Sequence, residues 1–152
     1  MILGDMELGV VVEPMFAENA YIAHRQGRAD CLIVDPSFDF EGIQHYLEEH
    51  QLQPAAILNT HGHSDHIAGN AAMKQAWPDC PLIIGHGDAL KLQDADANLS
   101  RPFGAVVLSP PADRTVAEGD SVSAAGFDLD VLETPGHSAG HVVFVWRAAN
   151  PI

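Results

Sequence analysis

The sequence carries its strongest signal in Thr60-His61-Gly62-His63-Ser64-Asp65-His66-Ile67-Ala68-Gly69, which places four potential metal ligands within six positions. Imidazole nitrogens and a carboxylate suit zinc, and they also suit iron or manganese. A helix cap would explain Asp65 but would leave three histidines unexplained. The clustering therefore favours a metal site over a polar loop.

The spacing of these residues has a geometric reason. The apolar run over residues 55–58 predicts a buried strand, so the ligand segment is expected to be the loop that leaves its C-terminal end. In nearly extended backbone, residues two apart point the same way, which lets His61, His63 and Asp65 converge. His66 must point elsewhere, as a second metal beside the first would require.

A second motif stands much later in the chain, at Thr134-Pro135-Gly136-His137-Ser138-Ala139-Gly140-His141. Together the two motifs resemble the metallo-β-lactamase superfamily, and within it the glyoxalase II-like branch, the hydroxyacylglutathione hydrolases. The resemblance runs from about Val10 to the end and includes Asn19-x-Tyr21 and Val34-Asp35-Pro36. It implies an αββα sandwich, in which two sheets pack face to face with helices outside and the metals at one rim.

The resemblance also assigns roles to residues. It implies that His61, His63 and His137 bind the first metal. Asp65, taken also as a catalytic residue, and His66 would bind the second. The implied cofactor is Zn²⁺, one or two ions, with iron or manganese as alternatives. A metal-bound hydroxide would be the nucleophile, so no protein nucleophile is needed.

The remaining polar residues receive weaker interpretations. His141 begins the last predicted strand and is expected to support the metal ligands or to pack, and Asp35 is expected either to orient the metal loop or only to form a turn. Gly119-Asp120 is expected to be turn chemistry. Four other histidines lack ligand spacing, so solvent exposure or local hydrogen bonding is expected for His24, His45, His50 and His86.

One departure from the family pattern matters. Past the last strand, relatives carry a Gly-Asp pair whose aspartate bridges both metals, and later a histidine that completes the second site; this sequence ends at Ile152 without them. We therefore expect a C-terminally incomplete fold. The first site would keep three histidines, whereas the second would keep two protein ligands and bind weakly. Exposed sheet would favour a homo-oligomer or aggregation.

Composition bounds the remaining possibilities. The 152 residues predict a single domain over residues 1–152, and 47% hydrophobic residues fit a globular core. A formal charge of −14 argues against nucleic acid as a partner. Cys31 and Cys80 form no CxxC pair and are expected to be ordinary thiols in a reducing compartment. Neither a signal peptide nor a membrane span is visible, so we expect no membrane partner and a cytoplasmic location.

Hydrophobic patterns give a coarse secondary structure, with strands expected over residues 8–13, 20–24, 31–34, 55–58, 81–84, 121–124, 127–131 and 142–146. Helices are expected over residues 40–50, from Ile67 through Trp77, and over residues 88–93. The segment 94–111 loses periodicity and is expected to be a long surface loop that shapes an active-site entrance. The pattern indicates an α+β protein with mixed sheets covered by helices.

Three functional hypotheses follow. The leading one is a metal-dependent, glyoxalase II-like hydrolase of a small-molecule thioester or ester, by resemblance a hydroxyacylglutathione. A persulfide dioxygenase-like iron enzyme shares the ligand motif, and metal analysis separates the two. A non-catalytic metal-binding remnant is the alternative from another class. Lactones and β-lactams also remain open as substrates, because a fold does not choose among acyl compounds.

Overall fold

The structure, a computed structural model, describes residues 2–147, which form two β-sheets. The large sheet has seven strands in the order of the chain, namely β1 (Ile2–Leu3), β2 (Met6–Glu13), β3 (Glu18–Arg25), β4 (Asp30–Val34), β5 (Gln53–Asn59), β6 (Leu82–Gly85) and β7 (Arg114–Val116). Strands β1 to β4 pair antiparallel, and β4 to β7 pair parallel. The small sheet is antiparallel, with β9 (Phe127–Glu133) between β8 (Ser121–Ala124) and β10 (Val142–Trp146).

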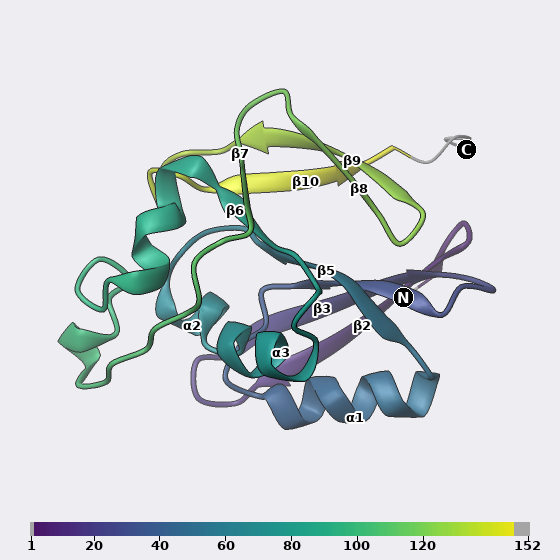
Figure 1. Ribbon diagram of the computed structural model, residues 1–152, viewed down its shortest axis with the longest axis horizontal. Coiled ribbons are helices and arrows are strands. Elements are labelled where there is room, and N and C mark those ends of the chain that lie inside the picture. The colour runs from purple at the N-terminus through teal and green to yellow at the C-terminus, as the bar shows by residue number, and fades with distance from the viewer. Residues whose placement is uncertain (1, 148–152) are drawn as a thin grey trace.

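Helices cover the outer face of the large sheet. Figure 1 shows α1 (Phe40–His50) and α3 (Asn70–Ala76) below it, with the small sheet stacked on the opposite face. The short helix α2 (Ser64–Ile67) and the 3₁₀ helices η1 (His86–Gln93) and η2 (Arg101–Phe103) lie toward one end of the sandwich. The layers of the described residues are therefore helix, sheet and sheet, which is the predicted αββα sandwich without its second helix layer.

Two hydrophobic cores hold these layers together. Successive residues of a strand point to opposite faces, and in β5 both faces are covered: Ile57 lies in the core under the helices and Leu58 in the core between the sheets. Ile43 and Leu47 of α1 pack into the first core, because they share one face of an amphipathic helix. Phe127 is one of the largest buried side chains and belongs to the second core.

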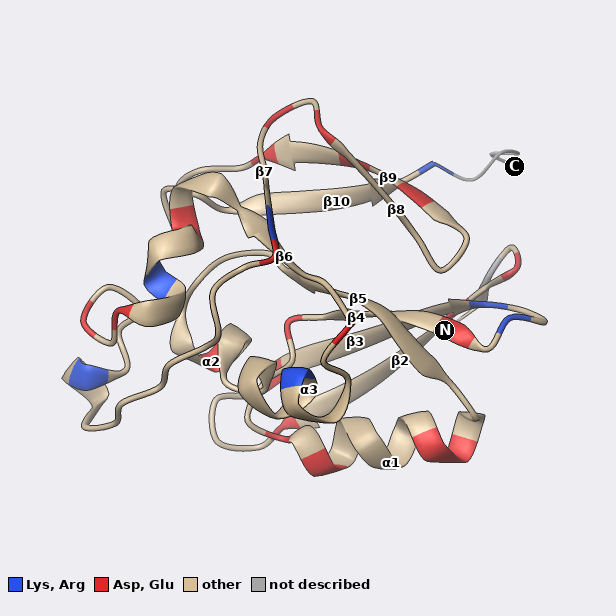
Figure 2. Cartoon of the chain, in the orientation of Figure 1, with Lys and Arg blue, Asp and Glu red and all other residues tan. Residues whose placement is uncertain are grey.

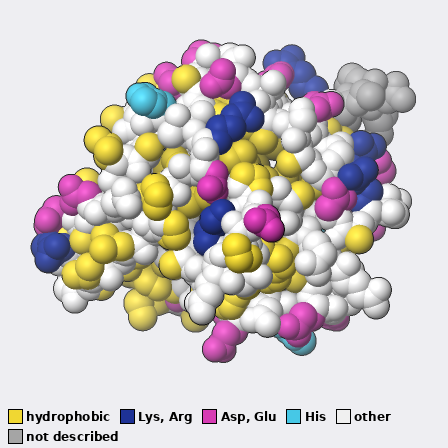
Figure 3. Space-filling view, in the orientation of Figure 1, with side chains coloured by type: hydrophobic (Ala, Val, Ile, Leu, Met, Phe, Trp, Pro, Cys, Tyr) yellow, Lys and Arg dark blue, Asp and Glu magenta, His cyan; other side chains and the backbone are white. Residues whose placement is uncertain are grey.

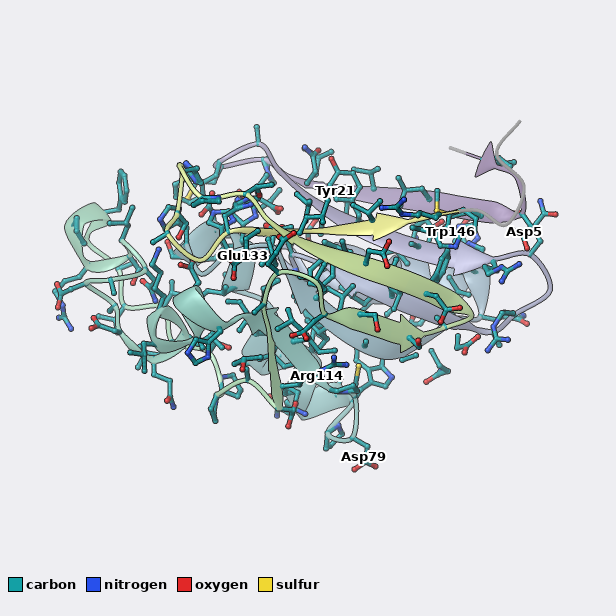
Figure 4. All side chains as sticks on the ribbon, turned by 90° about the horizontal axis from the view of Figure 1, so that it is seen from above. Asp5, Tyr21, Asp79, Arg114, Glu133 and Trp146 are labelled. Carbon is teal, nitrogen blue, oxygen red and sulfur yellow. The ribbon has the colours of Figure 1, made fainter. Side chains whose placement is uncertain are left out.

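The small sheet is covered on one face only. Between residues 2 and 147 no helix lies over its outer face, and β10 pairs only with β9, which leaves its other edge unpaired within that range. Seen from above in Figure 4, the small sheet crosses the large one, with Glu133 and Trp146 at opposite ends of it. The expected association through an exposed sheet stays a prediction, and sedimentation of the purified protein is the direct measurement.

Three local features differ in detail from the prediction. The helix expected from Ile67 through Trp77 is broken, because the chain at Gly69 approaches the segment before α1: the Gly69 amide donates to the Pro36 carbonyl at 2.8 Å, and a Cβ at this position would lie 2.6 Å from the Ser37 carbonyl oxygen. The helix expected over residues 88–93 is present as a 3₁₀ helix and begins two residues earlier, at His86. Strand β7 falls just after the expected loop and was missed because it has only three residues.

The surface is acidic and its basic groups are scattered. Figure 2 shows acidic residues on α1 and on the turns of the small sheet, with few lysines and arginines elsewhere. Hydrophobic side chains gather over the loop between η1 and β7 (Figure 3), where Leu99, Phe103, Val106 and Leu108 are exposed. None of the helices within residues 2–147 has the length and apolar character needed to cross a membrane.

Candidate metal centre

The candidate site lies where three neighbouring parallel strands end. Asp35 directly follows β4, His61 follows β5 by two residues, and Asp88 follows β6 by three. Because β4, β5 and β6 pair side by side in the same direction, their carboxyl ends meet at one edge of the sheet. The small sheet closes over this edge, since the Val142 amide donates to the Thr60 carbonyl at 2.8 Å.

Three histidines converge at this edge. One ring nitrogen each from His61, His63 and His137 lies within 4.8 Å of the other two. The Nδ1 of His63 is 3.0 Å from the Nε2 of His137, although the residues are 74 positions apart. The three ring centroids are separated by 4.7 to 4.9 Å, with the ring planes nearly perpendicular. This arrangement matches the convergence that the two motifs predict.

The environment of His61 suits a metal donor. His61 is only 2% exposed, and its Nε2 atom is buried and has no hydrogen-bond partner among the described residues. Its Nδ1 lies 3.0 Å from the Thr60 hydroxyl. Burial and the neighbouring histidines lower the pKa of His61 to about 2, so the ring is neutral and has a free lone pair to offer. Burial, Lys91 and His137 likewise lower the pKa of His63.

The unpartnered Nε2 atom of His61 shows whether these residues fit a metal ion. A buried polar atom without a partner is costly, and a cation at the centre of the three imidazoles would satisfy it. Three imidazoles form a donor set that suits zinc, iron or manganese. The residues present therefore fit a divalent metal.

A second group of polar side chains surrounds His66. Its Nδ1 lies 3.0 Å from an Asp35 oxygen and 3.6 Å from a Glu18 oxygen, while its Nε2 lies 3.6 Å from an Asp65 oxygen. Burial disfavours the protonated ring, but the hydrogen bond and the charge of Asp35 outweigh it and raise the pKa of His66. The ring centroid of His66 is 4.1 Å from that of His61. The donor atoms that lie within 4.8 Å of one another around His66 belong to Glu18, Asp35 and His66, and this group does not include Asp65.

Asp35 orients the loop and does more than form a turn. Its two oxygens accept hydrogen bonds from the Thr60 amide at 2.7 Å and the Thr60 hydroxyl at 2.6 Å, and the second oxygen also meets His66. The residue is buried and adopts a φ of +50°, a conformation that costs energy for a non-glycine residue. Glu18, which no motif singled out, lies beside it with Oε2 buried and without a hydrogen-bond partner in the described residues.

Asp88 is the second acidic residue that the motifs did not reveal. It is fully buried, and its oxygens accept hydrogen bonds from the Gly62 amide at 2.8 Å, from the Gly140 amide at 2.9 Å and from the Ser138 hydroxyl. Burial opposes its ionisation, but these donors and Lys91 lower the pKa of Asp88 below its usual value. Its position after a parallel strand was the only signal in the sequence.

The other predicted residues lie as follows. His141 stacks on His61 with ring centroids 5.0 Å apart, and its Nδ1 lies 2.7 Å from the Thr134 hydroxyl, which is the packing position expected for it. Asp120 accepts a hydrogen bond from the Ala117 amide at 2.9 Å within a turn, as expected for turn chemistry. Three of the remaining histidines are exposed as expected, namely His45, His50 and His86.

The predictions for His24 and for the two cysteines differ in outcome. His24 is only 8% exposed. Its Nε2 atom has no hydrogen-bond partner among the described residues and lies 3.7 Å from a carboxylate oxygen of Glu7. For this atom the expected exposure or local hydrogen bond was therefore wrong. Cys31 and Cys80 are both buried and free, as the interpretation of ordinary thiols expects.

An apolar hollow adjoins two of the three histidines, His63 and His137. It measures about 200 Å³ and is lined by Phe16, His63, Ser64, Asp65, Asn98, Leu99, Phe103 and His137. The loop that carries Leu99 and Phe103 contacts the ligand loop directly, because the Ser64 amide donates to the Asn98 carbonyl at 2.9 Å. Three residues of the segment 94–111, namely Asn98, Leu99 and Phe103, therefore line the hollow beside the ligand loop, and its role as an active-site entrance stays a prediction.

Comparisons with known proteins agree with this geometry. The sequence profile of the metallo-β-lactamase superfamily matches residues 15–150. The crystal structure of the B3 metallo-β-lactamase BLEG-1 superposes with a TM-score of 0.86 at 30% identity, covering 92% of this chain and 67% of that one. The chain therefore belongs to the metallo-β-lactamase superfamily, a superfamily of metal-dependent hydrolases, and has its fold.

Particular relatives narrow the comparison. A hydroxyacylglutathione hydrolase from Klebsiella pneumoniae is 31% identical over 137 residues, which is 90% of this chain and 47% of that protein. The crystal structure of TTHA1623, described as a di-iron-bound form, has a TM-score of 0.73 at 31% identity and covers 90% of this chain and 66% of that one. The chain spans about half the length of the curated relatives it matches, for example 57%, 39% and 47% of three of them.

Proposed function

We propose that this protein is a glyoxalase II-like hydrolase that cleaves a small-molecule thioester with one or two divalent metal ions. The single observation that carries the proposal is the buried, unpartnered Nε2 of His61 within a set of three convergent histidines. When bound there, a divalent metal supplies an activated water and charge that stabilises the oxyanion at a carbonyl carbon.

Different residues of the chain would bind the two metal ions. His61, His63 and His137 would hold the first metal, which leaves a fourth position open as catalytic zinc sites require. Asp65 and His66 would hold the second, and Asp35 fixes the direction of the His66 ring through its Nδ1. Asp65 also lines the hollow, so its carboxylate can orient a water or a substrate there.

The hollow beside the histidines supports an acyl substrate with an apolar part. Phe16, Leu99 and Phe103 supply its apolar wall, and none of its lining residues within the described chain is a lysine or an arginine. A charged thiol carrier such as glutathione would therefore have to lie largely outside this hollow. The hydroxyacylglutathione relatives support the thioester chemistry, whereas the acyl group is inferred from the hollow.

The test is turnover of purified protein loaded in turn with zinc, iron and manganese. We expect hydrolysis of lactoylglutathione or of an apolar acyl thioester, abolished by chelation and by His61→Ala. His86→Ala is the matched control, because His86 is exposed and does not belong to the cluster. A loaded protein that binds metal but cleaves no thioester, ester or lactone would leave only the metal-binding remnant.

The iron-dependent alternative has one observation in its favour, the di-iron form of a relative at 31% identity. A persulfide dioxygenase-like activity requires iron, because redox-inert zinc cannot activate oxygen. Metal content measured on protein purified without added metal, followed by oxygen uptake with a persulfide substrate, separates the two activities. The cytoplasmic location and the absence of nucleic-acid and membrane partners stay predictions.

A further inference from the structure

The two ligand loops of the first metal site are far apart in the chain, and one side chain contacts both. His61 and His63 lie in the loop after β5, whereas His137 lies between β9 and β10. We propose that Asp88 is the positioning residue that fixes these two loops against each other and thereby sets the affinity of the three-histidine site. The inference rests on the proposed metal centre and requires no particular substrate.

On one side, Asp88 holds the loop after β5. Its Oδ2 accepts a hydrogen bond of 2.8 Å from the amide of Gly62, the residue between His61 and His63. Since a hydrogen bond at this amide fixes the peptide planes that flank it, it determines how the two imidazoles leave the backbone. The hydrogen bonds of Asp88 go to loop atoms and not to the two imidazole rings, so they position the rings through the loop.

On the other side, Asp88 holds the loop of His137. Its Oδ1 accepts from the Gly140 amide at 2.9 Å, and its Oδ2 accepts from the hydroxyl of Ser138, the residue next to His137. The Lys91 ammonium lies 3.2 Å from Oδ1 and also donates to the Ser138 hydroxyl. One carboxylate thus joins segments 26 positions before it and 50 to 52 positions after it.

The packing around Asp88 indicates that this contact is built into the fold. A Cβ on Gly140 would lie 2.3 Å from the Asp88 amide nitrogen, and a Cβ on Gly62 would lie 3.0 Å from the Asp88 carbonyl oxygen. Both loops therefore approach the start of η1 at a distance that only glycine allows. The carboxylate is fully buried, so no water replaces it as an acceptor.

Asp88→Asn tests the proposal, because it keeps the shape but replaces one acceptor oxygen by a donor that faces N–H or O–H groups. The probe is cobalt(II), whose affinity is measured by competition with a chromophoric chelator and whose visible absorption reports the ligand geometry. We expect the dissociation constant of the tightest site to rise about 10- to 100-fold, with a changed spectrum. Asp113→Asn is the control. The Asp113 carboxylate also accepts hydrogen bonds from an amide and from a lysine, namely from the Leu82 amide at 2.8 Å and the Lys74 ammonium at 2.9 Å, but these partners do not belong to the ligand loops.

Circular dichroism and thermal melting distinguish a lost site from a lost fold. If Asp88→Asn does not fold, Ser138→Ala keeps the carboxylate and removes the one hydroxyl that lies between Asp88 and Lys91, and it should weaken cobalt binding in the same direction to a smaller extent. An unchanged affinity and spectrum in a folded Asp88→Asn variant, or an equal loss in Asp113→Asn, would overturn the proposal. A wild-type protein that binds no cobalt at all would refute the metal centre itself, and with it this role.

Discussion

Glu18 allows a sharp test of the electrostatics around His66. Its side chain is only 4% exposed, and burial, reinforced by Asp35 and opposed by His66, raises its pKa from 4.5 to about 7. When folding raises the pKa of a carboxyl group, the free energy of unfolding falls as the pH rises from the pKa of the unfolded chain to that of the folded protein. Below pH 4.5 it is protonated in both states, and from there to pH 7 the unfolded chain ionises first.

The size of the effect follows from that shift. One pKa unit corresponds to about 1.4 kcal/mol, so a change from 4.5 to about 7 corresponds to about 3 kcal/mol of unfolding free energy. Glu18→Gln removes the ionisation and leaves the shape. We expect the variant to be about 3 kcal/mol more stable than the wild type at pH 8 and to differ from it by less than about 1 kcal/mol at pH 5.

The assay is urea unfolding of the chelator-treated proteins between pH 5 and pH 8, followed by the fluorescence of Trp77 and Trp146. Glu13→Gln is the matched control from the same hairpin: its carboxylate is also buried but accepts from the Met15 and Phe16 amides, each at 2.8 Å, so its loss should destabilise the protein. A Glu18→Gln variant whose stability difference does not change with pH would refute the reasoning.

Three further outcomes are expected. His61→Ala should weaken binding of the first metal ion by more than about 100-fold, measured by equilibrium dialysis. The reason is that mutation of residues that only hydrogen-bond to metal ligands already lowers metal affinity about 10- to 100-fold. Phe103→Ala, at a residue 75% exposed, should leave the melting temperature nearly unchanged but lower kcat/KM for an apolar acyl thioester about fivefold relative to its acetyl analogue. Gly140→Ala should lower the free energy of unfolding by about 1–3 kcal/mol in urea titrations, since its Cβ would meet the Asp88 nitrogen at 2.3 Å.

The sequence alone was sufficient to predict features whose pattern repeats within a few residues. Alternation and apolar runs located most strands to within two or three residues, as for β2, expected from residue 8 and observed from Met6. The motifs brought His61 and His137 to one site because their neighbours in the chain match a known pattern. Local signals of this kind do not depend on the partner across the fold.

Features that depend on a distant contact were not predictable in this way. The break at Gly69 exists because the Pro36 carbonyl approaches its amide, and helical periodicity continues through that point. Glu18 stands at the start of β3 and looks like any polar residue at a hairpin. Its burial beside Asp35 and His66 follows only from the pairing of β3 with β4, which no residue near it encodes.

Asp88 lies between these two cases, because topology would have singled it out. Once β4, β5 and β6 are recognised as adjacent parallel strands, acidic residues just after each become candidates for one edge, and Asp35 and Asp88 both satisfy that rule. The same rule fails after β7, where the Asp120 carboxylate bonds the Ala117 amide within its own turn. β7 pairs only with β6 in the described sheet, so its end lies one strand further from the histidines that follow β5. Position after a parallel strand therefore identifies site residues only for the strand that carries the ligands and its immediate neighbours.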